Sequence, residues 1–290
     1  MTLHSRNKLS DRVLAMAAET LLFLSVCSLG FSVFTYQGDR SQGQSDQEKL
    51  EHILQKAGEY CARLNRIALY FVCTEDIVER IFTPYRRLPV SIGYSKTENR
   101  YLYDYQLIRK DKIEESRILL RENGIPSSMK DAPLKTQRFL YKYIIFGPIG
   151  IFGFEKQKLY DYFFEKETKL WGKPTLIVKA VPKNPKEVNC LYGKAWIDKN
   201  DGSILRIEWE GTSLGNYEAA LATAKRIGAK PRLMHYSEYR IEKNGIRFPN
   251  LYKINEEYYR TYRIEKSQLL VKYRDYKFFT VDTEVKIKIR

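Results

Sequence analysis

The sequence has little of the residues that carry most enzyme chemistry. Its only histidines are His4, His52 and His235, and none lies in a nucleophile or metal-ligand motif. No G-x-S-x-G, no H-E-x-x-H and no glycine-rich phosphate loop occurs in the chain. A pair of carboxylates far apart in the sequence, as glycosidases use, leaves no motif and stays open. We therefore expect a non-catalytic protein that holds no metal ion and no cofactor.

Cysteines are also few, and their spacing fits neither a metal site nor a redox centre. No C-x-x-C occurs, which argues against a zinc knuckle and a thioredoxin-like motif. Beyond the N-terminal segment lie Cys61, Cys73 and Cys190, and an oxidising compartment lets two of them pair. We expect Cys61 and Cys73 to lie close together as the candidate disulfide, with Cys190 free. Three buried thiols are the alternative.

The N-terminal segment lacks an apolar run long enough for a comfortable membrane span. Basic residues precede a mostly apolar run at residues 21–34, which is the arrangement of a signal peptide. Glu19 interrupts the longer apolar stretch and argues against a permanent anchor. We predict export to the periplasm or the outer membrane, with residues 1–36 as a signal peptide or, alternatively, an N-terminal anchor. The sequence L-S-V-C ending at Cys27 is similar to a bacterial lipoprotein box, which adds a lipid anchor at Cys27 as a further alternative.

Negative charge is scarce relative to positive charge. The net charge is +15, and residues 1–36 account for only three of the positive and two of the negative groups. The basicity therefore belongs to the folded part and predicts an anionic partner. Lysine and arginine interleaved with tyrosine, as at residues 272–277, would also suit a nucleic acid. Export argues against that partner, so we expect an anionic membrane surface and no nucleic acid.

Residues 191–210, LYGKAWIDKNDGSILRIEWE, show the clearest pattern in the chain. Two alternating segments flank the turn K-N-D-G, whose Asn, Asp and Gly tolerate the positive φ of tight turns. The pattern predicts a β-hairpin with one apolar and one polar face. Trp209 shares the apolar face with Ile207, whereas Trp196 lies on the other face. We therefore expect Trp209 to be the more buried of the two tryptophans.

Two helices are expected. Residues 37–47 are rich in Gly, Ser and Gln, which is typical of a flexible linker. Residues 46–64 then show apolar side chains at the spacing of an amphipathic helix. The second helix is expected at residues 214–227, ended by Gly228.

Most of the remaining chain alternates as strands do. Strands are expected at residues 69–81, 100–109, 113–121, 138–146, 175–181, 233–242, 246–258 and 262–279, with loops at 83–99 and 123–136. The dipeptide Asn244-Gly245 predicts a tight hairpin turn. We predict an α+β fold that is mainly β: a single domain at residues 48–290. It is built on a large curved antiparallel sheet, an incomplete barrel covered by a few helices.

The chain resembles the LolA/LolB-like superfamily of outer-membrane lipoprotein-sorting proteins. G-K-A-W-I-D at residues 193–198, followed by G-S-I-L-R-I-E at residues 202–208, is similar to a hairpin motif of those proteins. The resemblance loosely covers residues 50–285. It implies a half-barrel wrapped over helices, with an apolar hollow for acyl chains. This chain departs from the small carriers of that family by its greater length and its extra loops.

Residues 146–154, FGPIGIFGF, look like a loop by their Gly and Pro but are almost wholly apolar. Loops are normally polar because they lie on the surface. Either the segment folds back and plugs the core, or it lines the mouth of an apolar cavity or touches a membrane. In the second case five side chains form a hydrophobic rim for a ligand: Phe146, Ile149, Ile151, Phe152 and Phe154.

The sequence thus supports two hypotheses of function. The first is an exported envelope protein that binds or carries a lipid acyl chain or a lipoprotein in an apolar cavity. The second is a non-catalytic structural or interaction protein of the bacterial envelope that uses the same fold without a ligand.

Overall fold

The computed structural model describes residues 38–67, 70–87, 91–109, 112–184, 192–261 and 263–279. The chain divides into two compact units, Met1–Gln44 and Ser45–Arg290, and the description below concerns the second. Among the described residues, none of the helices combines the length and the apolar character needed to cross a membrane.

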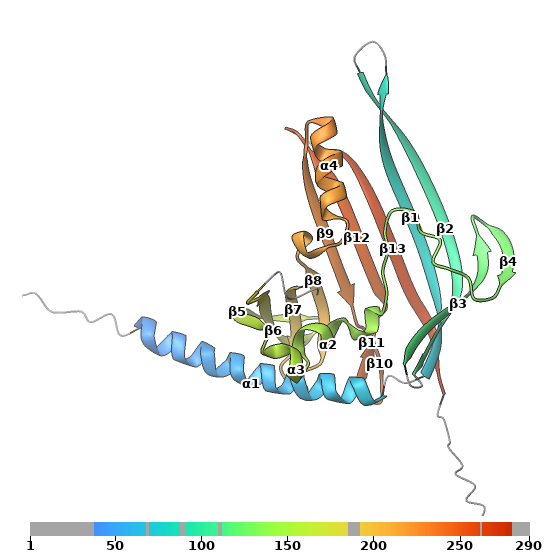
Figure 1. The fold of residues 1–290 in the computed structure, drawn as a ribbon. Helices are drawn as coiled ribbons and strands as arrows, with labels where there is room; N and C mark the ends of the chain where they lie inside the picture. Colours follow the sequence, from blue (N-terminus) through green and yellow to red (C-terminus); the bar gives the residue numbers. More distant parts are fainter. Residues whose placement is uncertain are drawn as a thin grey trace, which may run out of the picture. The chain divides into compact units, whose positions relative to one another are not determined.

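One large open sheet dominates this unit (Figure 1). Its strands follow the order β4-β3-β2-β1-β13-β12-β9-β8-β7-β6-β5, and β10 and β11 form a separate small ribbon. All neighbours in the large sheet pair antiparallel. The strands are β1 Tyr70–Arg87, β2 Ser91–Arg109, β3 Ile113–Glu122, β4 Ile125–Met129, β5 Tyr160–Leu170, β6 Lys173–Pro182, β7 Gly193–Asp198, β8 Ile204–Trp209, β9 Lys230–Glu238, β10 Ile241–Lys243, β11 Ile246–Phe248, β12 Leu251–Tyr259 and β13 Arg263–Phe278.

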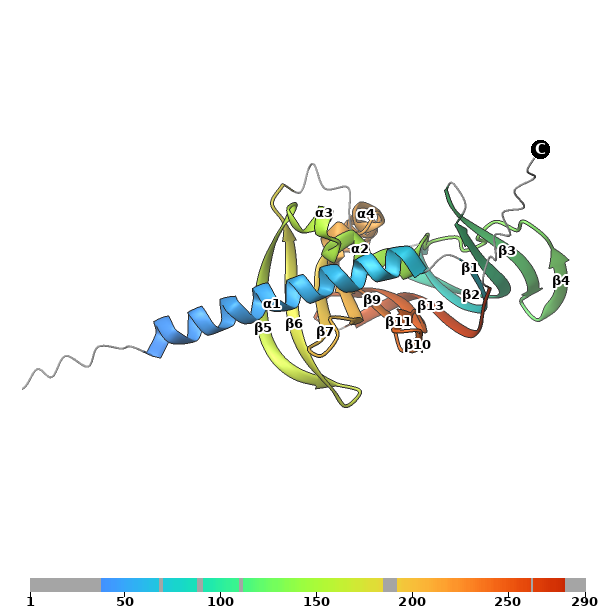
Figure 2. The same cartoon turned by 90° about the horizontal axis from the view of Figure 1, so that it is seen from below.

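The helices lie on the concave face of the curved sheet (Figures 1 and 2). They are α1 Gly38–Ile67, α2 Gly147–Phe152, α3 Phe154–Gln157 and α4 Tyr217–Ile227, with short 3₁₀ turns η1 Ile144–Phe146 and η2 Gly211–Ser213. The predicted fold class, a mainly β architecture with a large open antiparallel sheet and few helices, is confirmed.

The predicted central hairpin is confirmed as β7 and β8. Trp209 is only 8% exposed and lies in the core, whereas Trp196 is half-buried, so the predicted register is also confirmed. The turn of the hairpin packs against α1. A Cβ added to Gly202, at φ +70°, would lie 2.4 Å from the backbone of Lys56, so only glycine fits there. Lys56 also donates a hydrogen bond to the carbonyl of Lys199 at 3.0 Å.

Helix α1 supplies the first layer of the core. From Ser45 onward its buried side chains recur at helical spacing, as predicted: Leu50, Ile53, Ala57, Tyr60, Cys61 and Leu64. The predicted flexible linker at residues 37–47 is wrong from Gly38 on, because the helix already begins there. That stretch contains no proline, and its Gln and Arg residues are good helix formers.

The local turn signals were read correctly. Helix α4 ends at Gly228, whose φ of 62° is the left-handed conformation expected of a helix-terminating glycine. Asn244 and Gly245 have φ of 53° and 70°, which is the tight turn predicted for this dipeptide, between β10 and β11.

The predicted loop at residues 83–99 is wrong, because β1 continues to Arg87 and β2 begins at Ser91. Pairing of β1 with β13 ends at Arg80 and Gln268, and beyond that point β1 pairs only with β2. Pro84 therefore lies in the end of β1 that has one strand neighbour among the described residues, where a missing backbone N–H is tolerated.

Candidate functional site

A segment without regular structure crosses the concave face between β4 and η1. We call residues 132–143 the strap. Residues 138–143, predicted as part of a strand, have no strand partner, and Tyr143 adopts the left-handed conformation at φ 52°, so that prediction is wrong. Phe139 and Tyr141 point into the core and are buried, whereas Leu140 is exposed. The alternation that suggested a strand is therefore real, although the hydrogen-bond partners of a sheet are missing.

A buried carboxylate of β1 replaces those partners. Glu79 is fully buried and accepts backbone N–H groups from Gln137 at 2.9 Å, Arg138 at 2.9 Å and Phe139 at 3.3 Å. Buried backbone donors need a partner, and bonds to a carboxylate are stronger than bonds to a carbonyl. Glu79 thus fixes residues 137–139, the centre of the strap, to the floor of the sheet.

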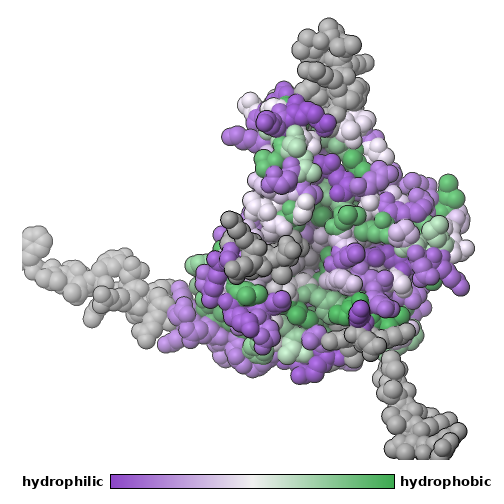
Figure 3. Space-filling model, in the orientation of Figure 1, coloured by the Kyte–Doolittle hydropathy of each residue, from purple (hydrophilic) through white to green (hydrophobic). Residues whose placement is uncertain are grey.

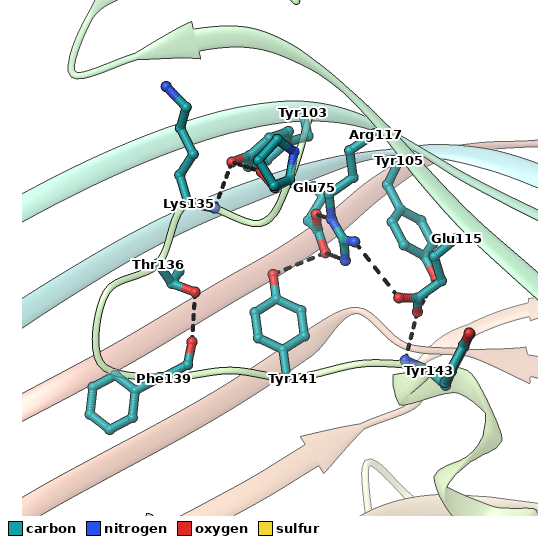
Figure 4. A network of polar contacts seen from close by, with 11 residues as sticks. Glu75, Tyr103, Tyr105, Glu115, Arg117, Lys135, Thr136, Phe139, Tyr141 and Tyr143 are labelled. Atoms are coloured by element: carbon teal, nitrogen blue, oxygen red, sulfur yellow. Dashed lines mark hydrogen bonds and ion pairs between the residues drawn. The ribbon is translucent and has the colours of Figure 1, made fainter. Parts of the chain in front are cut away.

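A second buried carboxylate, Glu75, holds a later part of the strap (Figure 4). Arg117 of β3 donates to it from Nε at 2.7 Å and from a terminal nitrogen at 3.3 Å. Tyr141 of the strap donates its hydroxyl to the same carboxylate at 3.0 Å. Burial opposes the charge of Arg117, but Glu75 outweighs it and raises the pKa of Arg117. The guanidinium also lies 4.9 Å from the ring centre of Tyr105.

Three further acids complete the attachment. Glu115 accepts the Tyr105 hydroxyl at 2.7 Å and the backbone N–H of Tyr143 at 2.6 Å, at the end of the strap (Figure 4).

The other two acids pair with cationic side chains of the strap. Arg138 donates from Nε to Glu256 of β12 at 2.9 Å, and a second bond joins the same groups. Nearer the start of the strap, Lys135 pairs with Glu122 of β3 at 2.5 Å. The strap is thus held to the sheet by five carboxylates rather than by a neighbouring strand.

These acids were missed in the sequence, although a signal existed. Glu75 and Glu79 share strand parity with the buried Cys73 and Ile77. A charged side chain at a core position needs a partner, and the partner here comes from a distant segment. No other signal in the sequence pointed to Arg117 or Arg138.

The predicted apolar loop is helical, and we call α2 and α3, residues 147–157, the plug. Pro148 stands in the first turn of α2, where its fixed φ favours a helix. Of the five predicted rim residues, Ile151 and Phe152 are 1% and 0% exposed in the core. Phe146 and Ile149 are half-buried against the same core, and Phe154 is 45% exposed.

The plug docks on α1 through a glycine. A Cβ added to Gly58 would lie 2.3 Å from the ring of Phe154, so the ring rests directly on the helix backbone. Gln157 donates its amide to the carbonyls of Leu54 and Phe152, both at 2.9 Å. The plug therefore closes onto α1 by one aromatic contact and one amide side chain.

Tyrosine hydroxyls satisfy the plug's own carbonyls. Tyr162 donates to the carbonyl of Ile151 at 2.5 Å, and Tyr239 donates to that of Ile144, just before the plug, at 2.9 Å. Burial raises the pKa of both tyrosines, which keeps both hydroxyls protonated as donors. The backbone of the plug thus has partners although it is buried.

Two surface cavities flank Ile81. One, of about 310 Å³, lies at the centre of the strap and is lined by Ile81, Gln137, Arg138, Asn216 and Ala219. The other, of about 390 Å³, is lined by Arg80, Ile81, Lys96, Thr97, Glu98, Lys266 and Gln268. Figure 3 shows hydrophobic residues at the surface among hydrophilic ones on the face of the molecule seen in Figure 1.

His235 is a core histidine rather than an exposed base. Its ring lies 5.9 Å from that of Trp209 and 4.8 Å from that of Tyr252. Neither ring nitrogen has a hydrogen-bond partner among the described residues, and burial lowers its pKa to about 3. The ring therefore stays neutral, as a structural histidine does. In the described ranges, His, Cys, Asp and Glu side chains form no group suited to a metal ion.

His235 makes stability depend on pH. Its ordinary pKa is 6.5, against about 3 in the folded protein, so only the unfolded chain takes up this proton between those values. We expect this residue to lower the free energy of unfolding by about 1.4 kcal/mol per pH unit as the pH falls from 6.5 towards 3. In urea unfolding, the free energy of unfolding of His235→Leu should fall less steeply with pH over that range than that of the wild-type protein. An equal pH dependence of the two proteins would contradict a neutral, buried His235.

The candidate disulfide is not formed. Cys61 and Cys73 are both free and buried, which is the alternative arrangement for these two thiols. Each is enclosed by other core side chains, and Cys73 shares a hydrogen bond with Tyr276. Burial raises the pKa of both thiols, so they stay protonated and unreactive. Cys190 and Cys27 lie outside the described residues.

No protein-family model and no curated protein matches this sequence. Solved structures similar to it include a LolA-superfamily protein from Nitrosomonas europaea, at 11% identity over 80% of this chain and 94% of that chain, with a TM-score of 0.35. A putative outer membrane lipoprotein-sorting protein domain from Vibrio parahaemolyticus matches at 13% identity over 80% and 94%, with a TM-score of 0.34. A DUF1329 family protein from Desulfovibrio piger matches at 11% over 80% and 94%, with a TM-score of 0.33.

The superfamily named from the hairpin motif is thus among the structural neighbours. At such identities and TM-scores the likeness concerns the fold alone.

Proposed function

We propose that the protein is a non-catalytic binding protein of the bacterial envelope that holds an acyl chain of a lipid or lipoprotein on the concave face of its sheet. The main support is the position of Ile151 and Phe152. They fill the core under the open sheet, yet they belong to a short helical segment and not to the sheet itself. An acyl chain offers the same kind of apolar surface and can take their place.

The free energy lost when the plug leaves the core is similar to the free energy gained when an acyl chain replaces it. Uncovering Ile151 and Phe152 costs about 1.5 to 3 kcal/mol each. Each methylene group that becomes buried contributes about 0.8 kcal/mol, so roughly four to eight methylenes offset the loss. The acyl chain of an ordinary membrane lipid exceeds that length. Displacing the plug also breaks the Gln157 and Tyr162 bonds to carbonyls, which water then replaces.

Phe154 allows the plug to be loosened without damage to the core. We expect Phe154→Ala to speed the uptake of a fluorescent fatty acid, because the ring that rests on Gly58 is lost while its own burial is small. Stopped-flow fluorescence measures the rate. Phe163→Ala is the matched control, since Phe163 is 53% exposed on β5 and carries no ring contact to the plug in the described structure. Uptake that is absent in the wild-type protein, or equal in both variants, would refute the proposal.

The complete burial of Ile151 and Phe152 also fits the second hypothesis, an interaction protein of the envelope that uses this fold without a lipid. Organic extraction of the purified protein followed by mass spectrometry separates the two. Co-purified lipid favours the carrier, whereas a lipid-free protein without fatty-acid uptake favours the interaction protein.

A further inference from the structure

The sheet splits between β1 and β13. Their pairing ends at Arg80 and Gln268, after which β1 follows β2 and β13 follows β12. The two strands diverge beyond this point (Figure 1). A hydrogen bond still bridges them, from the backbone N–H of Phe82 to the hydroxyl of Ser267 at 2.9 Å. The larger cavity, of about 390 Å³, lies at this split.

The lining of this cavity carries more positive than negative groups. Of its seven residues, three are cationic (Arg80, Lys96 and Lys266) and one, Glu98, is acidic. Glu98 is bound by Arg80 at 2.6 Å and by Arg100 at 2.6 Å, and Arg80, followed by Arg100, lowers its pKa. Lys266 lies 3.9 Å from Glu257, which does not line the cavity. The positive groups therefore outnumber the negative one, as a site for an anion requires.

The smaller cavity supplies further donors on the other side of Ile81. Arg138 lines it with a partly exposed guanidinium, and Asn216 lines it with a side-chain nitrogen. That nitrogen is buried and has no hydrogen-bond partner among the described residues. A buried donor without a partner is costly, so a ligand oxygen there would be stabilising.

We propose that the split between β1 and β13 binds the phosphate of an anionic lipid head group, with the rest of the head group passing Ile81 towards the strap. This inference rests on the proposed function, because the acyl chain would then continue under the strap and plug. Guanidinium and ammonium groups are the usual protein ligands of phosphate. Free phosphate shares this chemistry, and the measurement below distinguishes the two sources.

The probes are dihexanoylphosphatidylglycerol, dihexanoylphosphatidylcholine and inorganic phosphate, titrated into the full protein by calorimetry. We expect the phosphatidylglycerol (the glycerol lipid) to bind more tightly than the phosphatidylcholine (the choline lipid) and than inorganic phosphate. The double variant Lys96→Gln, Lys266→Gln should bind the glycerol lipid roughly tenfold more weakly, because charge-assisted bonds are lost. It should also no longer prefer the glycerol lipid to the choline lipid. Lys272→Gln with Lys277→Gln is the control on β13, outside the cavity lining, and should leave binding unchanged.

Each other outcome overturns the inference. If the two lipids bind equally and the Lys96 and Lys266 substitutions have no effect, the proposed head-group site does not exist. Inorganic phosphate that binds as tightly as the glycerol lipid shows a free-anion site instead of a head-group site. If neither lipid binds but fluorescent fatty acid is still taken up, only the head-group site is wrong. If the wild-type protein takes up no fatty acid, the proposed function itself is wrong.

Discussion

Replacing Arg117 with methionine is expected to lower the free energy of unfolding by about 3 to 5 kcal/mol. Among the described residues, the change leaves the fully buried Glu75 carboxylate with the Tyr141 hydroxyl as its one remaining donor. An uncompensated buried charge is among the most destabilising defects in a protein. The same change also weakens the attachment of the strap through Tyr141. Denaturant unfolding measures the effect.

Arg274→Met is the matched control. Its guanidinium lies 4.0 Å from Asp76 of β1 and 2.9 Å from Asp275, and these side chains are about half exposed. Exposed ion pairs contribute about 0 to 1 kcal/mol, so this variant should unfold nearly as the wild type does. The double variant Glu75→Gln, Arg117→Met should recover part of the loss, since the buried charge is gone. Equal effects of the Arg117 and Arg274 changes would show that the Glu75 pair is not essential.

Replacing Phe152 with alanine is expected to cost about 3 to 5 kcal/mol, because a fully buried aromatic ring leaves a cavity. The ring lies 5.7 Å from that of Tyr162, so an aromatic contact is lost as well. Thermal and denaturant unfolding both report this loss. A saturating fatty acid should restore part of it, since an acyl chain fills the vacated space and stabilises the folded state that binds it.

Phe163→Ala again serves as the control for this change, because its ring is half exposed and its loss should fall within about 0.5 kcal/mol. A Phe152→Ala protein as stable as that control would mean that the plug is not part of the core. Failure of fatty acid to restore stability, with uptake absent, would argue for the interaction protein.

Local patterns in the sequence were sufficient for part of the sheet and for its tight turns. The β7–β8 hairpin, the sidedness of Trp196 and Trp209, and the Asn244-Gly245 turn all depend on neighbouring residues. Their physics is short-range: alternation of side chains and tolerance of positive φ. For these elements the prediction from sequence was correct.

The strap and the plug could not be predicted in this way. Phe139 and Tyr141 alternate as in a strand, but their segment is held by Glu79 and Glu75, which lie some sixty residues earlier in the chain. Residues 146–154 contain the glycine and proline of a loop, although they are enclosed by α1 and the sheet and fold as helices. In both cases the conformation depends on contacts between distant segments, and one sequence does not reveal which segments meet.

The strand order has a consequence for how the molecule is assembled. The first strand of the sheet and the last lie side by side at its centre, and the paired residues Arg80 and Gln268 are 188 positions apart. In the described part of the chain, β13 is the strand through which β1 to β4 join β12 and β5 to β9 in the large sheet. Pairing across such a separation is entropically costly and slow. While β13 is still being synthesised, the chain can form only two partial sheets, each with an unpaired edge. A nascent chain crossing a membrane from its N-terminus would therefore complete its central sheet last.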